Sequence, residues 1–517
     1  MCGIAGIWGS CDRALVERMM ADIAHRGPDG SGIHLGRDGV LGHRRLAIMD
    51  PDGGAQPLYD ETGNAAIVAN GEIYNYPELR AGLDDRHTFV TTSDTEAVLH
   101  LFEERADATP IALDGMFAFA VADGAGAGPD GAGDDPGRLF LARDPIGIKP
   151  LYYGRGLDSA GRPVLAFASE LKALADWVDE LAEFPPGTSF DSRVGFSRYY
   201  EVPTAGPVER PPDEHARLVR EGLEAAVESH LMSDVPVGAF LSGGLDSSVL
   251  AALARRHVDE LHTFSVGLAG SRDIEAARRV AVHIGSIHHE YLMTVDEVVA
   301  TLPEIVHALE SFDQDLVRSA IPTYFCSRLA ADHVKVILTG EGADELFAGY
   351  AYHKSIGDPD TLHRELCRSV AALHDINLQR VDRLTMVHGL EGRVPFLDTR
   401  FIELALSVPP ELKLVAADDG RLIEKWILRK ACEDLLPADI VWRTKEQFDE
   451  GSGTLELLGD ALAPLLNRFD LDAYRAGCEE PLRSAEEAFY HQLLSAGYPR
   501  PELILANVAR WTDDRHF

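Results

Sequence analysis

The chain has 517 residues, 45% of them hydrophobic, which is enough for two or more domains with sizeable cores. Aspartate and glutamate total 84 against 48 lysine and arginine residues, so the formal net charge is −36. This excess disfavours nucleic acid and anionic membranes as partners, because both repel an acidic surface. We find no apolar run long enough to cross a bilayer, no signal peptide and no Cys-x-x-Cys pair among the six cysteines. A reducing cytoplasm is therefore the expected location.

The first residues are expected to form a buried strand that carries a candidate nucleophile. Residues 1–9 alternate small and apolar side chains, and removal of the initiator methionine would make Cys2 the first residue. The α-amine of a terminal cysteine titrates near neutral pH and can act as base for its own thiol. Such a nucleophile suits amide hydrolysis. Taken alone, a second-position cysteine is more often a small buried residue at the start of a strand.

An arginine follows that is suited to bind a carboxylate. Apolar residues at helical spacing predict a helix over residues 12–25, and a strand is expected over residues 42–50. Arg45 emerges from this strand and could hold a substrate carboxylate through two parallel hydrogen bonds. Considered apart from the other motifs, Arg45 is more typical of a charged residue on the protein surface.

The segment 66–75 is an apolar strand interrupted by Asn70-Gly71. Asn-Gly alone is typical of a hairpin turn. The Asn70 side-chain amide and the Gly71 backbone N–H are also suited to an oxyanion hole, and Glu72 could receive a substrate ammonium group. Asp94 could contact the same ammonium, although it also fits the acidic first turn of a helix.

The remainder of the first half is predicted to be structural. Two paired strands are expected over residues 116–121 and 139–144, and the segment 124–137 between them is rich in Gly, Asp, Ala and Pro, as flexible loops are. A proline-rich linker then separates two predicted domains, residues 1–200 and 213–517.

The most specific string of the chain is residues 235–248. An apolar strand leads into Ser242-Gly243-Gly244, and a helix follows. The glycines let the backbone approach a ligand, and free N–H groups at the helix start attract an anion. The Gly-Lys-Ser/Thr lysine of the common P-loop is absent, so a pyrophosphate with its own magnesium, held by Asp246, is the better fit. Ser-Gly-Gly alone would equally suit an ordinary strand-to-helix turn.

Strands and helices alternate through the second half. Strands are expected over 263–268 and 334–338, which indicates a doubly wound parallel sheet with its sites at the carboxyl ends of the strands. We expect the intervening helices over residues 213–230, 273–283, 295–309 and 318–331.

Polar residues follow the strand 334–338. Asp344 is suited to magnesium and Glu341 to contact or deprotonate an incoming nitrogen, although acidic residues also favour a helix start. Further on, Lys445 is suited to neutralise charge on leaving pyrophosphate. The pair His288-His289 does not predict a metal site, because adjacent strand residues point to opposite faces.

Together these strings resemble the glutamine-hydrolysing (class B) asparagine synthetases. The resemblance rests on Cys2-Gly-Ile, Asn70-Gly-Glu-Ile-Tyr-Asn, Ser93-Asp-Thr-Glu and the strings around Asp246 and Asp344, in this order, and extends to about residue 448. It implies an α/β protein with an N-terminal Ntn-hydrolase αββα sandwich and a C-terminal ATP-pyrophosphatase domain with a doubly wound parallel sheet.

The resemblance also implies roles for individual residues. The catalytic residues would be Cys2, Asn70, Gly71, Glu341 and Lys445; the glutamine-binding residues Arg45, Ile48, Asn70, Gly71, Glu72 and Asp94; the ATP-binding residues Leu241, Ser242, Gly243, Gly244, Asp246, Ser247, Ser248, Val266, Thr339 and Gly340; the magnesium ligands Asp246 and Asp344; and the acceptor-binding residue Arg318.

The implied reaction uses glutamine as nitrogen donor and ATP with Mg²⁺ to activate aspartate as an adenylate, giving asparagine, AMP and pyrophosphate. The partners are then small molecules, with no nucleic acid or membrane, and a homodimer is the assembly that the resemblance suggests. Asp315-Leu316 stands where bacterial relatives often have two threonines, so another acceptor acid, for example in secondary metabolism, stays open. A non-catalytic sensor of glutamine or nucleotide is the alternative from another class.

Overall fold

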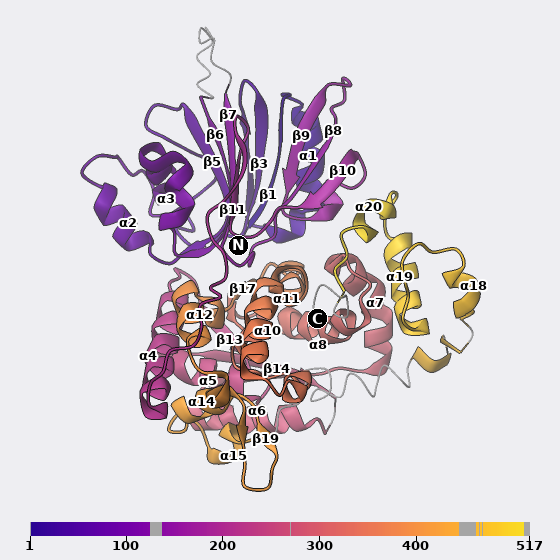
Figure 1. Ribbon diagram of the computed structural model, residues 1–517. Coiled ribbons are helices and arrows are strands. Elements are labelled where there is room, and N and C mark those ends of the chain that lie inside the picture. Colours follow the sequence, from indigo (N-terminus) through magenta and orange to yellow (C-terminus); the bar gives the residue numbers. More distant parts are fainter. Residues whose placement is uncertain are drawn as a thin grey trace.

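The computed structural model describes residues 2–124, 137–268, 270–443, 462–464, 466–467 and 469–510. Two packed antiparallel sheets form the N-terminal half, and a parallel sheet surrounded by helices forms the C-terminal half (Figure 1). Within these residues, no helix is both long and apolar enough to cross a bilayer.

The N-terminal half is a four-layered sandwich, as predicted. One sheet has the order β10-β8-β9-β1-β3-β2, the other β12-β11-β7-β6-β5-β4. Helix α1 packs on the first sheet, α3 packs on the second, and α2 packs on α3. The bounds are β1 Cys2–Trp8, α1 Arg13–Asp22, β2 Gly30–Leu35, β3 Gly39–Arg45, β4 Leu58–Tyr59, β5 Ala65–Ile73, α2 Tyr76–Leu83, α3 Asp94–Arg105, β6 Gly115–Asp123, β7 Arg138–Arg143, β8 Tyr152–Leu157, β9 Pro163–Ala168, β10 Val178–Glu183, β11 Thr188–Asp191 and β12 Gly195–Arg198.

Three local expectations change. The helix expected over 12–25 ends at Asp22 and is followed by a 3-10 turn, Ala24–Arg26. The strand expected over 42–50 is β3, which ends at Arg45, where its pairing with β1 also ends. Strand β5 runs through Asn70-Gly71 without a turn, because all nine of its residues pair with β6. Pairing with a long neighbouring strand overrides the local preference of Asn-Gly. The expected loop 124–137 lies almost wholly outside the described residues.

The C-terminal half is built on the sheet β15-β14-β13-β16-β17, in which every strand is parallel to its neighbours. The strands are β13 Val237–Phe240, β14 His262–Gly267, β15 Ile287–Leu292, β16 Val336–Leu338 and β17 Glu391–Arg393, the last of which was not predicted as a strand. The chain adds β14 and β15 on one side of β13 and then β16 and β17 on the other. The loops after β13 and β16 therefore flank the point where strand order reverses, which is where α/β sheets bind ligands.

Helices cover this sheet on both faces. They are α4 Pro212–His230, α5 Leu245–Ala254, α6 Arg272–Ile284, α7 Val295–Leu309, α8 Gln314–Ala331, α9 Ala343–Leu346, α10 Pro359–Ala371, α11 Asn377–Met386, α12 Thr399–Leu406, α13 Pro410–Lys413, α14 Trp426–Ala431 and α15 Ala438–Val441, with a small hairpin, β18 Val415–Ala416 and β19 Leu422–Ile423. Helix α8 begins four residues before the predicted 318, because the Asp313 carboxylate accepts the N–H groups of Asp315 and Leu316.

The last described segment returns to the rest of the molecule. Its helices are α18 Leu471–Arg475, α19 Ala485–Ala496 and α20 Pro501–Leu505, and α19 packs on α7 and α8 (Figure 1). Beyond these contacts, the Arg500 guanidinium donates to the Val178 carbonyl oxygen at 2.9 Å and the Asn507 amide to the Leu181 carbonyl oxygen at 3.2 Å. Both acceptors lie on β10, so the end of the chain is tied to the N-terminal half.

Candidate active sites

The first candidate site surrounds Cys2. Arg45 is its direct partner across the β1–β3 pair, so the arginine predicted to bind a carboxylate lies beside the predicted nucleophile. The Cys2 backbone nitrogen donates to Asn70 Oδ1 at 3.0 Å, which orients the amide. The buried Asn70 Nδ2 has no acceptor among the described residues, so it is available to a ligand. A Cβ at Gly71 would lie 2.0 Å from the Met116 carbonyl oxygen, so only glycine fits there.

The other predicted glutamine-binding residues lie on neighbouring segments. The Arg45 guanidinium donates to the carbonyl oxygens of Asp50 at 2.6 Å and Pro51 at 2.9 Å, which holds it in place. The buried Asp94 carboxylate accepts the Ile73 N–H at 2.8 Å, which joins the start of α3 to the end of β5. Ile48 is buried, and Glu72 faces Arg393 of β17 at 3.6 Å.

Burial determines the electrostatics of this site. It raises the pKa of the Cys2 thiol, and the carboxylates of Glu72 and Glu391 add to the effect. It also raises the pKa of Glu72 well above its usual value, with repulsion from Glu391 and Asp94 as further causes. The thiol is therefore protonated at neutral pH and needs a base to become a nucleophile.

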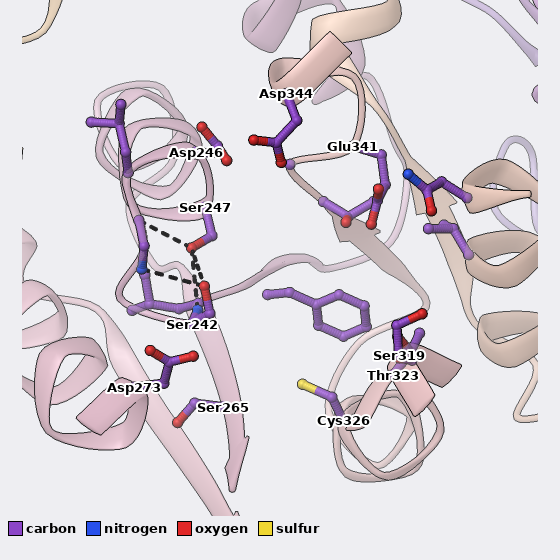
Figure 2. Close-up of a pocket in the computed structure, with 18 of the residues that line it drawn as sticks. Ser242, Asp246, Ser247, Ser265, Asp273, Ser319, Thr323, Cys326, Glu341 and Asp344 are labelled. Carbon is purple, nitrogen blue, oxygen red and sulfur yellow. Dashed lines mark hydrogen bonds between the residues drawn. The ribbon is translucent and has the colours of Figure 1, made fainter. Parts of the chain in front are cut away.

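The second candidate site is a cavity of about 400 Å³ at the carboxyl ends of the parallel strands. On one wall, the Ser242 and Ser247 hydroxyls lie 3.1 Å apart, and the Gly244 N–H donates to Ser242 Oγ at 3.3 Å (Figure 2). Gly243 has φ +73°, and a Cβ there would lie 2.5 Å from the Ala277 nitrogen, so the sharp turn before α5 requires glycine. This wall is the predicted phosphate cradle.

The predicted acidic residues lie on the opposite wall. Glu341 follows β16 and Asp344 lies in the short helix α9; Figure 2 shows the Asp246 carboxylate beside that of Asp344. The Arg380 guanidinium donates to Glu341 at 2.5 Å. Cavity-lining residues from the predicted nucleotide set are Leu241, Ser242, Gly244, Asp246, Ser247, Val266, Thr339 and Gly340.

Four predicted residues do not line the cavity or lie outside the described residues. Gly243 and Ser248 are not among the lining residues; Gly243 shapes the turn, and Ser248 is buried in the first turn of α5. Lys445 lies outside the described residues. Arg318 is also not a lining residue, and its guanidinium donates to both Glu486 carboxylate oxygens, at 2.9 and 2.6 Å.

A lysine that was not predicted joins the two acidic groups. Lys425 Nζ lies 2.6 Å from Asp246 Oδ2 and 2.7 Å from Asp344 Oδ1, and its side chain is 1% exposed. Lys425 precedes α14 with φ 55°, far along the chain from the motifs, so no local pattern indicated it. Its position shows that the two carboxylates converge on one point.

The last segment of the chain also contacts the lining of this pocket, although no role was predicted for it. Asp315 and Leu316 line the cavity. Arg483 reaches Asp315 at 3.0 Å and Asp313 at 2.8 Å. Together with Glu486 on Arg318, these contacts place α19 and its preceding loop behind the cavity wall at Asp315, although no described residue of this segment lines the cavity itself.

Helix α11 connects the two sites. Its Asp382 carboxylate accepts two hydrogen bonds from the Arg26 guanidinium, at 2.7 and 3.0 Å. Arg26 also donates to the Cys2 carbonyl oxygen at 3.1 Å and to Glu170 at 2.6 Å. Two residues before Asp382, Arg380 of the same helix contacts Glu341. A single helix thus reaches the nucleophile's strand through Arg26 and contacts the acidic wall of the cavity directly.

Two family models match the chain. The glutamine amidotransferase domain model covers residues 1–185, and the asparagine synthase model covers residues 218–358 and 354–509. Asparagine synthetase [glutamine-hydrolyzing] 2 of Oryza sativa subsp. japonica is 41% identical over 474 residues, spanning 88% of this chain and 78% of the relative. A probable asparagine synthetase [glutamine-hydrolyzing] of Dictyostelium discoideum is 37% identical, spanning 99% and 96%.

Among solved structures, NMN synthetase from Francisella tularensis covers 56% of this chain and 96% of its own, with 13% identity and a TM-score of 0.22, too low to support an argument. The two matched models define a glutamine amidotransferase domain joined to a synthase domain. On the identity and coverage of its relatives, the chain belongs to the asparagine synthetase family.

Proposed function

We propose that the chain is a cytoplasmic, glutamine-dependent asparagine synthetase with a glutaminase domain over residues 1–200 and a synthetase domain over residues 213–517. The observation that supports this most is that one helix, α11, lines a nucleotide-sized cavity and is joined through the buried Arg26 to the strand that carries the buried Cys2 thiol. A sensor of glutamine or nucleotide would need neither Cys2 nor the convergent acidic pair in the cavity.

In the first half-reaction, Arg45 binds the glutamine carboxylate, Glu72 and Asp94 bind its ammonium group, and Ile48 packs beside it. The Cys2 sulfur attacks the side-chain amide carbon, and the α-amine of processed Cys2 accepts the thiol proton. Asn70 Nδ2 and the Gly71 N–H stabilise the oxyanion. Ammonia leaves, and water hydrolyses the thioester to glutamate. The raised pKa of the thiol supports the need for this terminal base.

In the second half-reaction, the cradle of Leu241 to Ser248, with Val266, Thr339 and Gly340, binds ATP. The aspartate side-chain carboxylate attacks the α-phosphorus, forming an aspartyl-adenylate and pyrophosphate. Lys425 and Lys445 neutralise charge on the leaving pyrophosphate. Ammonia then attacks the acyl carbon, Glu341 accepts a proton, and asparagine and AMP are released.

Magnesium fits the same cavity. Asp246 and Asp344 converge on one point, and carboxylate oxygens are ligands that Mg²⁺ prefers. These two residues would hold the ion, which when bound neutralises phosphate charge. We propose that ammonia crosses an internal apolar passage between the two sites, where water is excluded.

A carboxylic acid other than aspartate is the alternative acceptor substrate. Asp315 and Leu316 line the cavity, and Asp315 brings a carboxylate rather than a hydroxyl to its wall. Arg318, the proposed acceptor ligand, is engaged by Glu486. These two observations favour testing other carboxylic acids as acceptors beside aspartate.

The test measures pyrophosphate and AMP with glutamine, ATP, Mg²⁺ and a panel of carboxylic acids. We expect aspartate to give equimolar asparagine, AMP and pyrophosphate. Release with another acid but not aspartate would assign the second acceptor. Glutamine hydrolysis without acid-dependent pyrophosphate, or cleavage of ATP to ADP, would contradict the proposal.

A further inference from the structure

Two histidines and two glutamates converge on the outer helical side of the N-terminal half, and neither candidate site uses them. Glu61 lies in the turn between β4 and β5, His87 in the loop between α2 and α3, and His100 and Glu103 one turn apart on α3. One donor atom from each of the four lies within 4.8 Å of all the others. Segments distant in sequence thus bring four metal-ligating groups together.

The four histidine–carboxylate distances in this group lie between 2.8 and 3.7 Å, around the spacing of a tetrahedral zinc site, with Glu61 using a different oxygen toward each histidine. His100 Nδ1 lies 2.8 Å from Glu103 Oε2 and 3.7 Å from Glu61 Oε2. His87 Nδ1 lies 3.2 Å from Glu61 Oε1 and 3.5 Å from Glu103 Oε2. Zinc bonds to nitrogen and oxygen of about 2.0–2.2 Å place tetrahedral ligand atoms about 3.3 Å apart. Shifts of a few tenths of an ångström would give this geometry.

The far side of each imidazole faces another carboxylate. His87 Nε2 lies 3.4 Å from Glu104 Oε1, and His100 Nε2 lies 3.7 Å from Glu96 Oε1. Glu96 is itself fixed by the N–H groups of Val90 and Thr91, each at 2.7 Å. Histidines that bind metals commonly direct their second nitrogen at a carboxylate, which sets the tautomer and raises ligand basicity.

The charges also favour a cation. The rings of His87 and His100 stack with centroids 4.6 Å apart, so protonation of both would place two positive charges face to face. One divalent ion balances the Glu61 and Glu103 carboxylates while both imidazoles stay neutral. The His100 side chain is 1% exposed and that of Glu61 33%, so the group is anchored in the fold and open to solvent on one side.

We propose that Glu61, His87, His100 and Glu103 bind one zinc ion in a closed structural site. Two imidazole nitrogens and two carboxylate oxygens fill the four positions that zinc takes in such sites. The ion would tie the β4–β5 turn and the α2–α3 loop to α3. Because α3 begins at Asp94, zinc would also stabilise the helix that carries a proposed glutamine ligand.

Another histidine group provides a matched control. His262, His289 and His333 also bring nitrogens within 4.8 Å. In this group, however, His262 Nδ1 is hydrogen-bonded to His289 Nε2 at 2.9 Å, so these two nitrogens already satisfy each other. The group also includes no carboxylate to balance the charge of a metal ion. His289→Gln therefore removes a clustered histidine without touching the proposed site.

The test uses the full-length protein after chelator treatment, titrated with Zn²⁺ against a chromophoric chelator, and with Co²⁺ followed by absorption. We expect His87→Gln and Glu103→Gln to lower zinc affinity by at least about tenfold, since even outer-shell changes cost that much, and His289→Gln to leave it unchanged. Bound Co²⁺ should give strong tetrahedral visible bands without thiolate charge transfer. Zinc should raise the melting temperature of wild type and His289→Gln but not of His87→Gln.

Equal zinc affinity in wild type, His87→Gln and Glu103→Gln would overturn the assignment. So would loss of binding in His289→Gln alone, or cobalt bands that require a cysteine ligand. Glu103→Gln keeps side-chain shape at a partly exposed position, so it preserves the test if His87→Gln folds poorly. Circular dichroism of each variant before titration establishes that it is folded.

Discussion

The Cys2 thiol combines burial with negative neighbours, both of which oppose thiolate formation. Its reactivity must then come from a base at the moment of attack rather than from a standing thiolate. Asn70 has two groups that serve this site. Its side-chain oxygen accepts the hydrogen bond of the Cys2 backbone N–H, and its buried Nδ2 has no acceptor among the described residues. One side chain can therefore position the nucleophile and stabilise the oxyanion.

Replacing Cys2 by alanine should abolish glutamine-dependent synthesis and leave ammonium-dependent synthesis intact, because the cavity holds a separate set of groups. The measurement is AMP and asparagine formation with glutamine or with ammonium chloride as nitrogen source. Cys11→Ala is the control, since Cys11 is exposed and distant from both sites. Loss of both activities in Cys2→Ala alone would mean that the two reactions cannot be separated.

Lys425 is the buried cation between Asp246 and Asp344. Lys425→Met removes a charge that we expect to act on pyrophosphate, so ATP-dependent turnover should fall by about 100-fold or more. Glutaminase activity measured without ATP should stay near that of wild type. Lys430→Met, at an exposed lysine paired with Glu433, is the matched control and should retain turnover. Normal pyrophosphate release by Lys425→Met would remove the lysine from the proposed chemistry.

Among the described elements of the C-terminal half, α11 is one that contacts the N-terminal half. Its buried Asp382 pairs with Arg26, whose side chain is 0% exposed. Asp382→Asn leaves the guanidinium without its full counter-charge, and breaking a buried pair costs about 3–5 kcal/mol. We expect a clear loss in denaturant midpoint and a higher ratio of glutamine hydrolysed to asparagine formed.

Two further variants sharpen this experiment. Glu17→Gln breaks an exposed pair with Arg13 and should change stability by no more than about 1 kcal/mol. The double variant Arg26→Met/Asp382→Leu replaces the buried pair by apolar groups and should recover stability but not coupling. A normal ratio of the two products in Asp382→Asn would show that α11 does not couple the sites.

The elements with strong local patterns were predictable. The helix Val295–Leu309 has the predicted bounds, since a capping box at Thr294 and apolar spacing agree there. The cradle at Ser242–Ser247 was also recognisable, because strand, glycine turn and helix start are contiguous. Lys425 and α11 were not, because their roles arise only from contacts between distant segments. Arg318 was predicted as an acceptor ligand from the family resemblance alone, and nothing in its own segment indicates that Glu486 contacts it.

For the whole molecule, a titratable pair lies where the two halves meet. Burial alone would lower the pKa of His374, but the neighbouring Glu183 carboxylate of β10 raises it. Burial alone would raise the pKa of Glu183, but the positive charges of His374 and Arg143 lower it to about 2. The His374–Glu183 distance is 2.8 Å, and Asp375 lies beside the pair.

The pair should make stability depend on pH. A raised histidine pKa contributes stability that is fully present below its unfolded value of 6.5 and is lost as pH rises through the folded value. The lowered Glu183 pKa contributes stability above 4.5 that is lost as pH falls toward about 2. His374→Gln should therefore lower the melting temperature most near pH 6 and progressively less at alkaline pH. A pH-independent difference between variant and wild type would contradict the assignment.

The bonds from Arg500 and Asn507 to β10 have a consequence for synthesis of the chain on the ribosome. Strand β10 is an edge strand of the first domain to emerge, yet two of its carbonyl groups receive their partners only from residues translated near the very end. During synthesis, this edge of the N-terminal half stays exposed until the segment around α20 has been translated. Premature termination before Arg500 would thus remove both hydrogen bonds to β10 and change the environment of the N-terminal half.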